Sequence, residues 1–456
     1  MRRGIVLVGS LADPSSEEDA RPDRDNGSDF MATRIVRIID RLNVGGPAKH
    51  VVWLTSGLQT ARFQTELITG ACALGETDMG YFARGLGVQP RLIPSMSREI
   101  GVRDCLVIIR LIQELFRLKP DVVHTHKSKA GTTGRIAAMV YKWLSPSALR
   151  LQPRRCKVVH TYHGHIFHSY YGPTKSWLFL SIERLLARVC TDRIIVISEL
   201  QRREICERFR VGHPRQFRLI PLGIDMEELP QAGGPVFREE LQVPADELLI
   251  GAVGRLTAIK NHIMLLQSAK ELFRLLAGVG LRARFVIIGD GHLRPRLEQH
   301  AQELGIAKQV TFTGFRPEVL SLYPALDVIA FTSLNEGTPL TLIEAMACGL
   351  ATAATEVGGV PDLLGTRRFR QEGFSVWDHG VTVPSQDVAS FARALKFLAE
   401  RPTLRAQMGA QGCAFARMNF SRERLLQDFA QLYGELSVDV GSPLQTRVQP
   451  VVDSNL

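Results

Sequence analysis

The 456-residue sequence predicts an α/β fold with two doubly wound parallel sheets that face a cleft. Three observations lead to this prediction. Short apolar runs alternate with helical patterns along most of the chain, which is typical of βαβ units. The alternation pauses over 221–247, which is rich in Pro, Gly and acidic residues, and then restarts. Gly-rich or charged segments follow strands in both halves, where open α/β sheets bind ligands.

The predicted elements follow from this alternation. In the first half we expect strands at 34–39, 65–68, 121–124, 157–161 and 193–197, and helices at 47–59, 103–118, 131–143, 176–190 and 199–209. In the second half we expect strands at 248–253, 283–288, 309–312, 327–331 and 351–354, and a last helix at 421–435.

These elements define the predicted domains. We expect a disordered leader at 1–30, a first domain at 31–222, a linker at 223–247, a second domain at 248–418, a C-terminal helix at 419–436 and a disordered tail at 437–456. The C-terminal helix is a candidate to pack back on the first domain. Met31 directly precedes the first strand and is an alternative start of the protein.

Charge is unevenly distributed between the two halves. Residues 31–225 carry 30 basic and 14 acidic side chains, whereas residues 226–456 carry 22 basic and 25 acidic ones. A basic first domain favours an anionic partner, such as a membrane surface, a phosphorylated lipid or nucleic acid, although a solvated basic face gives the same count. No known nucleic-acid-binding module is present.

Two further features of the composition bear on location. No apolar run approaches the roughly 18 residues that span a bilayer. The seven cysteines are scattered without a CxxC pair, which favours free thiols in a reducing compartment. We therefore expect a cytoplasmic protein, with peripheral attachment to the inner face of the plasma membrane as an option that the basic first domain leaves open.

The stretch 333–349, SLNEGTPLTLIEAMACG, carries two acids in an apolar setting. Thr338 and Pro339 suit the start of a helix, with Thr338 as its cap, and Gly349 suits its end. Glu336 then lies in the preceding loop and Glu344 inside a buried helix. A buried carboxylate needs hydrogen-bond donors, so other parts of the chain must supply them.

Several segments of the first half follow strands and are candidates for the cleft. Gly45 and Gly46 enter a helix, where backbone N–H groups favour an anion, although Gly-Gly turns are common. Lys127 and Lys129 are candidates to hold a phosphate, or simply belong to a solvated loop.

Histidines recur in the same half. His124 and His126 share a strand face but lack a third metal ligand nearby in sequence. His160, His163, His165 and His168 lie within nine residues, yet no zinc spacing accompanies them, so polar histidines that face the cleft are favoured over a metal site. We therefore predict no metal site.

In the second half, Arg255 and Lys260 flank a strand-to-helix turn, and two cations beside free backbone N–H groups suit a diphosphate. Gly289 and Gly291 enclose Asp290 in a second tight turn, and Gly314, Phe315 and Arg316 end another strand. No DxD motif follows a strand, so the metal-bridged type of sugar transferase is not indicated.

Together these segments resemble the retaining glycosyltransferases of family 4, which have the GT-B fold of two Rossmann-like domains. The resemblance rests on GRL…KN (254–261), GDG (289–291), VTFTGF (310–315) and EGTPLTLIEAMACG…ATEVGGVPDLL (336–364), and covers about residues 31–435. HTHKSKAGTTGRIAA (124–138) and TYHGHIFHSYYG (161–172) further resemble bacterial exopolysaccharide and capsule members. One departure is an apparent insertion at 366–379.

The resemblance implies roles for individual residues. Arg255 and Lys260 are expected to bind the donor diphosphate, Glu344 the ribose, and Glu336 the transferred sugar, with His163 facing that sugar from the first domain. The implied donor-binding set also contains Gly289, Gly314, Phe315, Arg316, Gly337, Thr338, Pro339 and Leu340. Gly45 and Gly46 are expected to approach the ligand, and His126, Lys127 and Lys129 to meet the acceptor.

The expected reaction is retaining transfer of a hexose from a nucleotide-sugar, most simply UDP-linked, to a glycan or lipid-diphosphate-linked acceptor in cell-surface polysaccharide synthesis. Arg255, Lys260 and the helix start stabilise the leaving diphosphate, so no metal or other cofactor is expected. Three alternatives stay open: a UDP-sugar 2-epimerase of the same fold, a non-catalytic transferase-like subunit, and a nucleic-acid-binding protein.

Overall fold

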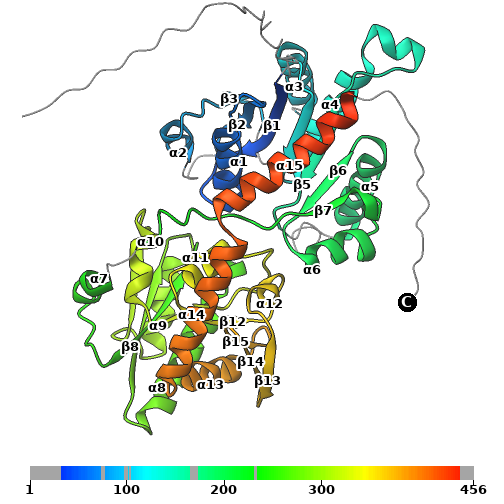
Figure 1. Cartoon of the computed structure of the whole chain (residues 1–456). Coiled ribbons are helices and arrows are strands. Elements are labelled where there is room, and N and C mark those ends of the chain that lie inside the picture. The colour runs from blue at the N-terminus through cyan, green and yellow to red at the C-terminus, as the bar shows by residue number, and fades with distance from the viewer. Residues whose placement is uncertain are drawn as a thin grey trace, which may run out of the picture.

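The computed structural model of the protein describes residues 32–72, 78–96, 101, 104–164, 173–230 and 234–441. It contains two α/β lobes, each built on one largely parallel sheet (Figure 1). The N-lobe comprises the first sheet, its helices and the last helix, and the C-lobe comprises the second sheet and its helices. The predicted fold class is therefore confirmed. The expected leader, most of the expected tail, His165 and His168 lie outside the described residues.

The N-lobe sheet has seven parallel strands in the order β3-β2-β1-β4-β5-β6-β7. Its strands are β1 (Thr33–Arg41), β2 (Phe63–Gly70), β3 (Arg91–Leu92), β4 (Val122–His126), β5 (Lys157–Thr161), β6 (Arg193–Val196) and β7 (Phe217–Leu219). The order reverses direction beside β1, as it does in doubly wound folds. Strands β3 and β7 were not predicted, because two or three residues are too few to show a period.

Helices cover both faces of this sheet, in line with the nearly continuous burial of its central strands. They are α1 (Gly46–Gly57), α2 (Gly80–Gly85), α3 (Asp104–Leu118), α4 (Ser128–Trp143), α5 (Pro173–Val189) and α6 (Glu199–Arg202), with a π-helical turn at Arg203–Arg208 and 3₁₀ turns at Pro146–Arg150 and Pro214–Gln216. Ile35 and Ile39 of β1 pack towards α1, α2 and the last helix, whereas Val36 and Ile38 pack towards α3 and α4.

The C-lobe sheet has eight strands in the order β10-β9-β8-β11-β12-β15-β14-β13. Its strands are β8 (Glu247–Val253), β9 (Arg282–Ile288), β10 (Val310–Gly314), β11 (Val328–Phe331), β12 (Ala351–Thr355), β13 (Arg367–Gln371), β14 (Phe374–Trp377) and β15 (Gly380–Val383). The segment that departs from the family pattern forms the antiparallel hairpin β13–β14 and extends this sheet at its edge. Gly373, with φ of 80°, makes its turn.

The C-lobe helices bury two apolar layers against this sheet. They are α7 (Gly234–Glu240), α8 (His262–Ala277), α9 (Arg294–Glu303), α10 (Val319–Leu322), α11 (Leu340–Ala347), α12 (Val360–Leu363), α13 (Val388–Ala399) and α14 (Pro402–Asn419), with 3₁₀ turns at Ala258–Lys260 and Tyr323–Ala325. Helix α7 lies within the expected linker at 223–247, and its Phe237 is buried in the C-lobe core.

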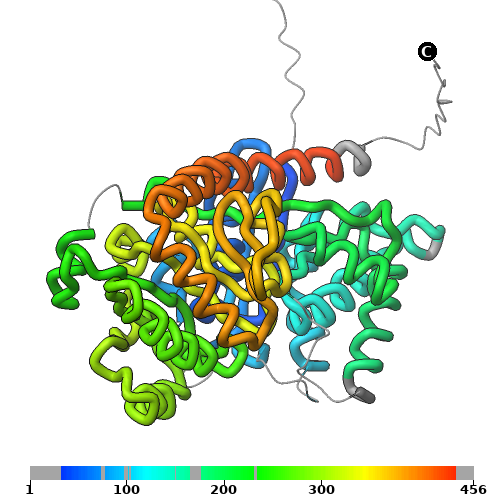
Figure 2. The backbone as a smooth tube through the Cα atoms, turned by 90° about the horizontal axis from the view of Figure 1, so that it is seen from below, coloured from blue at the N-terminus to red at the C-terminus, as the bar shows by residue number. Residues whose placement is uncertain are grey.

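The last helix, α15 (Arg422–Gly441), returns to the N-lobe, where it lies beside α1 (Figures 1 and 2). Its apolar residues recur at helical spacing and enter the N-lobe core: Leu425, Phe429, Leu432, Tyr433 and Leu436. The helix runs five residues beyond the boundary expected at 436. The two segments that cross between the lobes touch, since the Ile224 N–H donates to the Phe420 carbonyl at 2.7 Å.

No helix in the described ranges combines the length and the apolar composition that crossing a bilayer requires.

Candidate functional site between the lobes

Lys260 and Glu336 form an ion pair at the edge of the C-lobe. Lys260 follows β8 and Glu336 follows β11, two neighbouring strands whose carboxyl ends share one edge. The Lys260 Nζ donates to Glu336 Oε1 at 2.6 Å, and the Ser333 hydroxyl donates to the same oxygen at 2.9 Å. Both charged side chains keep about a fifth of their surface exposed. The pair is therefore accessible to a charged ligand.

The backbone around this pair is tightly packed. Gly289, with φ of 140°, lies so close to the preceding loop that a Cβ there would stand 2.0 Å from the Gly254 carbonyl oxygen. A β-bridge joins Gly289 to Gly314, so the ends of β8, β9 and β10 form one rim. Arg255 follows Gly254 on this rim with an exposed side chain. Arg255, Lys260 and Glu336 thus lie on the same edge of the C-lobe sheet as Gly289 and Gly314.

The donors that Glu344 needs come from both lobes. This carboxylate is 8% exposed on α11, and the Tyr323 hydroxyl donates to its Oε2 at 3.2 Å. Lys49, on α1 of the N-lobe, places its Nζ 4.0 Å from Glu344 Oε1. Burial raises the pKa of Glu344, while Lys49 and Tyr323 oppose that shift. Neither Lys49 nor Tyr323 was predicted, because nothing in their local sequence points to a carboxylate in another domain.

The start of α11 differs from the expectation. Pro339 is the N-cap, the helix begins at Leu340, and no side chain caps it. Thr338 is therefore not the cap: its Oγ1 is buried without a hydrogen-bond partner. The loop is fixed instead by backbone, since the Gly359 N–H donates to the Gly337 carbonyl at 2.7 Å. The end of the helix is as predicted, with Gly349 at φ of 80° just beyond Ala347.

Two glycines let the lobes approach closely. A Cβ on Gly46, at the start of α1, would lie 2.4 Å from Leu340 Cδ1 of the C-lobe. A Cβ on Gly337 would lie 3.1 Å from Gly164 Cα and 3.4 Å from the His163 carbonyl oxygen of the N-lobe. The starts of α1 and α11 therefore face each other across the cleft, and two helix N-termini at one place favour a negatively charged ligand.

His163 follows β5 and is held by histidines of neighbouring elements. Its Nε2 shares a hydrogen bond of 2.9 Å with His126 Nδ1, at the end of β4. His124 and His126 stack with ring centroids 4.1 Å apart, which confirms that they share a strand face. Burial, then His50 and Lys127, hold the pKa of His163 well below its usual range. His163 is thus neutral at neutral pH.

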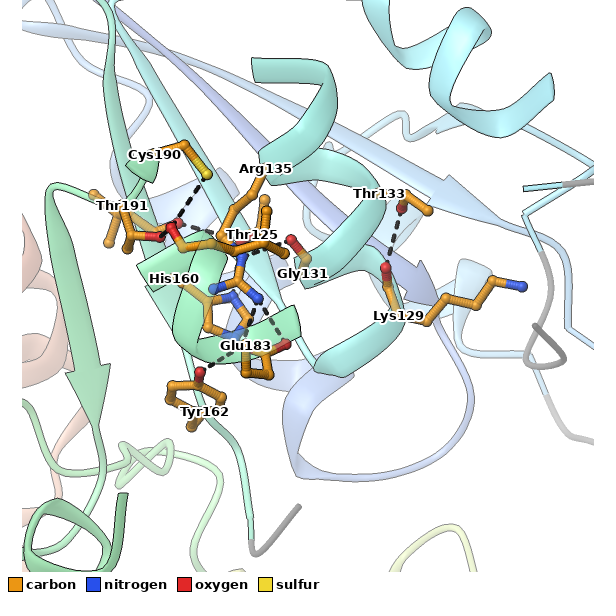
Figure 3. A network of polar contacts seen from close by, with 12 residues as sticks. Thr125, Lys129, Gly131, Thr133, Arg135, His160, Tyr162, Glu183, Cys190 and Thr191 are labelled. Carbon is orange, nitrogen blue, oxygen red and sulfur yellow. Dashed lines mark hydrogen bonds and ion pairs between the residues drawn. The ribbon is translucent and has the colours of Figure 1, made fainter. Parts of the chain in front are cut away.

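A buried network that was not predicted lies behind the segment that carries His163 (Figure 3). Arg135 of α4 donates to both carboxylate oxygens of Glu183 on α5, at 2.6 and 2.7 Å. The Tyr162 hydroxyl donates to the same carboxylate at 2.6 Å. Arg135 is fully buried and Glu183 is 3% exposed. Because Tyr162 precedes His163, the network fixes the backbone that presents His163 to the cleft.

The lysines expected to meet an acceptor phosphate are paired within the protein. Lys127 Nζ lies 3.0 Å from Asp40 Oδ1, and Lys129 Nζ lies 2.8 Å from Asp104 Oδ1. Lys129 is 9% exposed. An acceptor phosphate would have to compete with these carboxylates, so the structure gives little support to this part of the interpretation.

Arg316 is also engaged within the protein. Its guanidinium pairs with Glu240 of α7 and with Glu318, both at 2.6 Å. These hydrogen bonds raise its pKa above the usual range. The neighbouring Phe315 is 55% exposed on the rim formed by Gly289 and Gly314. Phe315 is therefore the better placed of the two to stack on a base.

Two family models match the chain. The model described as Glycosyltransferase Family 4 matches residues 44–228, and that described as Glycosyl transferases group 1 matches residues 235–414. The UDP-Gal:alpha-D-GlcNAc-diphosphoundecaprenol alpha-1,3-galactosyltransferase of Escherichia coli is 31% identical over 276 residues, which cover 60% of this chain and 67% of that enzyme. The putative glycosyltransferase EpsD of Bacillus subtilis is 27% identical over 79% of this chain and 87% of its own length.

Solved structures share the fold. HepE of Anabaena, solved in complex with UDP and glucose, superposes with a TM-score of 0.70 at 18% identity over 88% of this chain and all of that one. Sucrose-phosphate synthase of Thermosynechococcus elongatus gives 0.70 at 21% identity over 89% of this chain and all of that one. With the two family models and the E. coli relative, the two-lobed site identifies this chain as a member of the family 4 glycosyltransferases of the GT-B superfamily.

Proposed function

We propose that the protein transfers a hexose, with retention of configuration, from a UDP-linked donor to a lipid-diphosphate-linked glycan during cell-surface polysaccharide synthesis. The observation that carries this proposal is the convergence of the Lys260–Glu336 pair, the start of α11 and His163 at the contact between the lobes. Substrate atoms bound there would meet side chains from both lobes at once.

The charges suit departure of a nucleoside diphosphate. Breaking the sugar–phosphate bond places negative charge on the diphosphate, and in this proposal Arg255, Lys260 and the N-terminus of α11 stabilise that charge as it develops. A bound diphosphate would compete with Glu336 for Lys260. Glu336 would then be free to accept hydrogen bonds from the sugar hydroxyls, while Glu344 would accept those of the ribose.

These groups supply the positive charge that a bridging cation provides in other transferases, so transfer without an added divalent metal is part of the proposal. His163 is neutral and faces the sugar as a hydrogen-bonding group, not as an acid. For retention we propose a front-face displacement, in which the attacking hydroxyl gives its proton to the leaving phosphate.

The acceptor side of the proposal rests on the N-lobe surface. Large apolar side chains are exposed on α3 and α5, including Leu106 (58%), Ile109 (51%), Trp177 (66%) and Leu185 (62%). They lie in the half of the chain that carries 30 basic and 14 acidic residues. Exposed apolar and basic groups together suit the anionic surface of a membrane, so attachment at its cytoplasmic face is part of the proposal. The name of the E. coli relative also specifies a diphospholipid acceptor.

The donor is tested by incubating the protein with UDP-glucose, UDP-galactose, UDP-GlcNAc and GDP-mannose, with and without an α-GlcNAc-diphospholipid. We expect one UDP-sugar to be consumed, with UDP released chiefly when acceptor is present, and an α-linked product by NMR. EDTA should leave the rate unchanged. An epimerised sugar formed without acceptor, or no stabilisation by any nucleotide-sugar, would refute the proposal.

Variants test the assigned roles. Lys260→Ala should lower transfer by about 10²–10³-fold, as removal of one group that stabilises developing charge does. Glu336→Gln should also lower it strongly, with UDP binding retained. Lys270→Ala, which removes an exposed lysine on α8, is the matched control and should behave like the wild type. Transfer at the wild-type rate by Lys260→Ala or Glu336→Gln would contradict the assigned roles.

A further inference from the structure

Three histidines from separate elements meet on the N-lobe side of the cleft. His50 lies on α1, His126 ends β4 and His163 follows β5. Each offers one ring nitrogen, and the three nitrogens lie within 4.8 Å of one another. The ring centroid of His50 lies 4.9 Å from that of His163 and 5.8 Å from that of His126. Such a trio has the donor set of a three-histidine transition-metal site.

Unused nitrogens of the same rings provide a second observation. Both ring nitrogens of His50, Nε2 of His126 and Nδ1 of His163 are buried without a hydrogen-bond partner. His50 is 2% exposed and His126 is fully buried. Buried polar atoms are normally satisfied, so the wholly unpartnered ring of His50 in this cluster indicates a binding partner.

Burial keeps the three rings in the neutral form, while the same burial and the positive neighbours act against any cation. Burial, then Arg37 and Arg424, lower the pKa of His50 to about 3. Burial also lowers the pKa of His126 and of His163. All three imidazoles are therefore neutral near pH 7, and neutral imidazole is the form that binds metal ions.

The distances require only small ring movements. Two nitrogens on a tetrahedral zinc ion, each about 2.0–2.1 Å from it, stand about 3.3 Å apart. The His126 Nδ1–His163 Nε2 separation is 2.9 Å, and every pair in the trio lies within 4.8 Å. For both of these nitrogens to bind a metal ion, the proton that they now share moves to the other nitrogen of its own ring, His126 Nε2 or His163 Nδ1.

The positively charged side chains around the trio act against a bound cation. Arg37 acts on His50 and His126, whereas Lys127 acts on His163. Lys127 is partly neutralised by Asp40 at 3.0 Å, so the positive field is weaker on the His163 side. No carboxylate belongs to the trio, so an anion such as hydroxide or chloride is expected as the fourth ligand.

We propose that His50, His126 and His163 form a binding site for a borderline transition-metal ion such as Zn²⁺, and that its occupation inhibits transfer. Inhibition follows because metal coordination withdraws His163 from the sugar. The inhibitory half rests on the proposed function, whereas metal binding does not.

Binding is tested with full-length protein without a histidine tag, in which Co²⁺ replaces Zn²⁺ as a visible probe. We expect one equivalent of Co²⁺ to give the d–d absorption of a tetrahedral site, without thiolate charge-transfer bands, and Zn²⁺ to abolish it. His50→Gln and His50→Leu should lose this spectrum while near-UV circular dichroism stays native. His300→Gln, which removes a histidine of the C-lobe helix α9, is the control and should keep it.

Inhibition is tested in parallel with the donor identified above. Zn²⁺ should inhibit the wild type, and His50→Gln should keep its activity and need at least about tenfold more Zn²⁺ for the same inhibition, a difference of about 1.4 kcal/mol. A thiolate-type spectrum, no spectrum, or equal Co²⁺ binding by His50→Gln overturns the site. Stoichiometric Co²⁺ binding without inhibition overturns the inhibitory half. Absence of any transfer refutes the proposed function and leaves the spectral test standing.

Discussion

Acidification should destabilise the N-lobe through His50. This side chain is 2% exposed between the sheet and α15, and burial lowers its pKa from about 6.5 to about 3. The folded protein therefore keeps His50 neutral at a pH where the unfolded chain protonates it. The stabilisation is fully present above about pH 6.5 and is lost progressively as the pH falls towards 3.

The magnitude follows from this difference. A pH of about 5 is about 1.5 units below the pKa of His50 in the unfolded chain, and each unit corresponds to about 1.36 kcal/mol. One histidine therefore costs about 2 kcal/mol of unfolding free energy between about pH 7.5 and pH 5. His124 and His126 add to the loss in the same direction, because burial also lowers their pKa values.

The assay is urea unfolding at both pH values, followed by tryptophan fluorescence and far-UV circular dichroism, with EDTA present to exclude metal binding. His50→Gln should lose about 2 kcal/mol less than the wild type on acidification. His292→Gln, at an exposed position of the C-lobe, is the control and should lose as much as the wild type. Equal losses for His50→Gln and the wild type would refute the reasoning.

Three other substitutions test the remaining contacts. Arg135→Met should lower the unfolding free energy by about 3–5 kcal/mol, since it leaves the buried Glu183 charge without its partner; a Tm equal to the wild type would contradict this. Tyr323→Phe removes the donor to Glu344 and should cost about 1–3 kcal/mol in urea unfolding, whereas no change would indicate that Lys49 suffices. Gly289→Ala should abolish UDP binding in calorimetry, because its Cβ would meet the Gly254 carbonyl at 2.0 Å; unchanged affinity would disprove the role of this rim.

Much of the fold could be predicted because long parallel strands carry a strong signal. The run at 248–253 is continuously apolar and became β8, and the run at 34–39, apolar except for Arg34 and Arg37, became β1. The hairpin β13–β14 was not predicted, although its Gly373 turn is present in the sequence. All five residues of β13 are exposed, so the strand shows no apolar periodicity.

Some residues of the candidate site could be predicted from the sequence, and others could not. Lys260 and Glu336 were predicted because both follow strands that end at one edge, and the structure joins them by an ion pair. Lys49 was not predicted as a partner of Glu344, because its significance depends on what the other lobe places beside it. The position of His50 beside His126 and His163 was not predicted either, because it depends on the neighbouring strands. The prediction that Thr338 caps α11 was wrong, because a backbone hydrogen bond from Gly359 to Gly337 fixes the loop instead.

The path of α15 has a consequence for synthesis of the chain. Residues near the start of the described chain, such as Ile35 and Leu54, pack against Leu425 and Phe429 near its end. During translation the N-lobe emerges first, yet the part of its sheet and of α1 that α15 covers stays open until that helix leaves the ribosome. The half that is made first is therefore completed last, and a nascent chain halted at α14 would display an open apolar face for chaperones to bind.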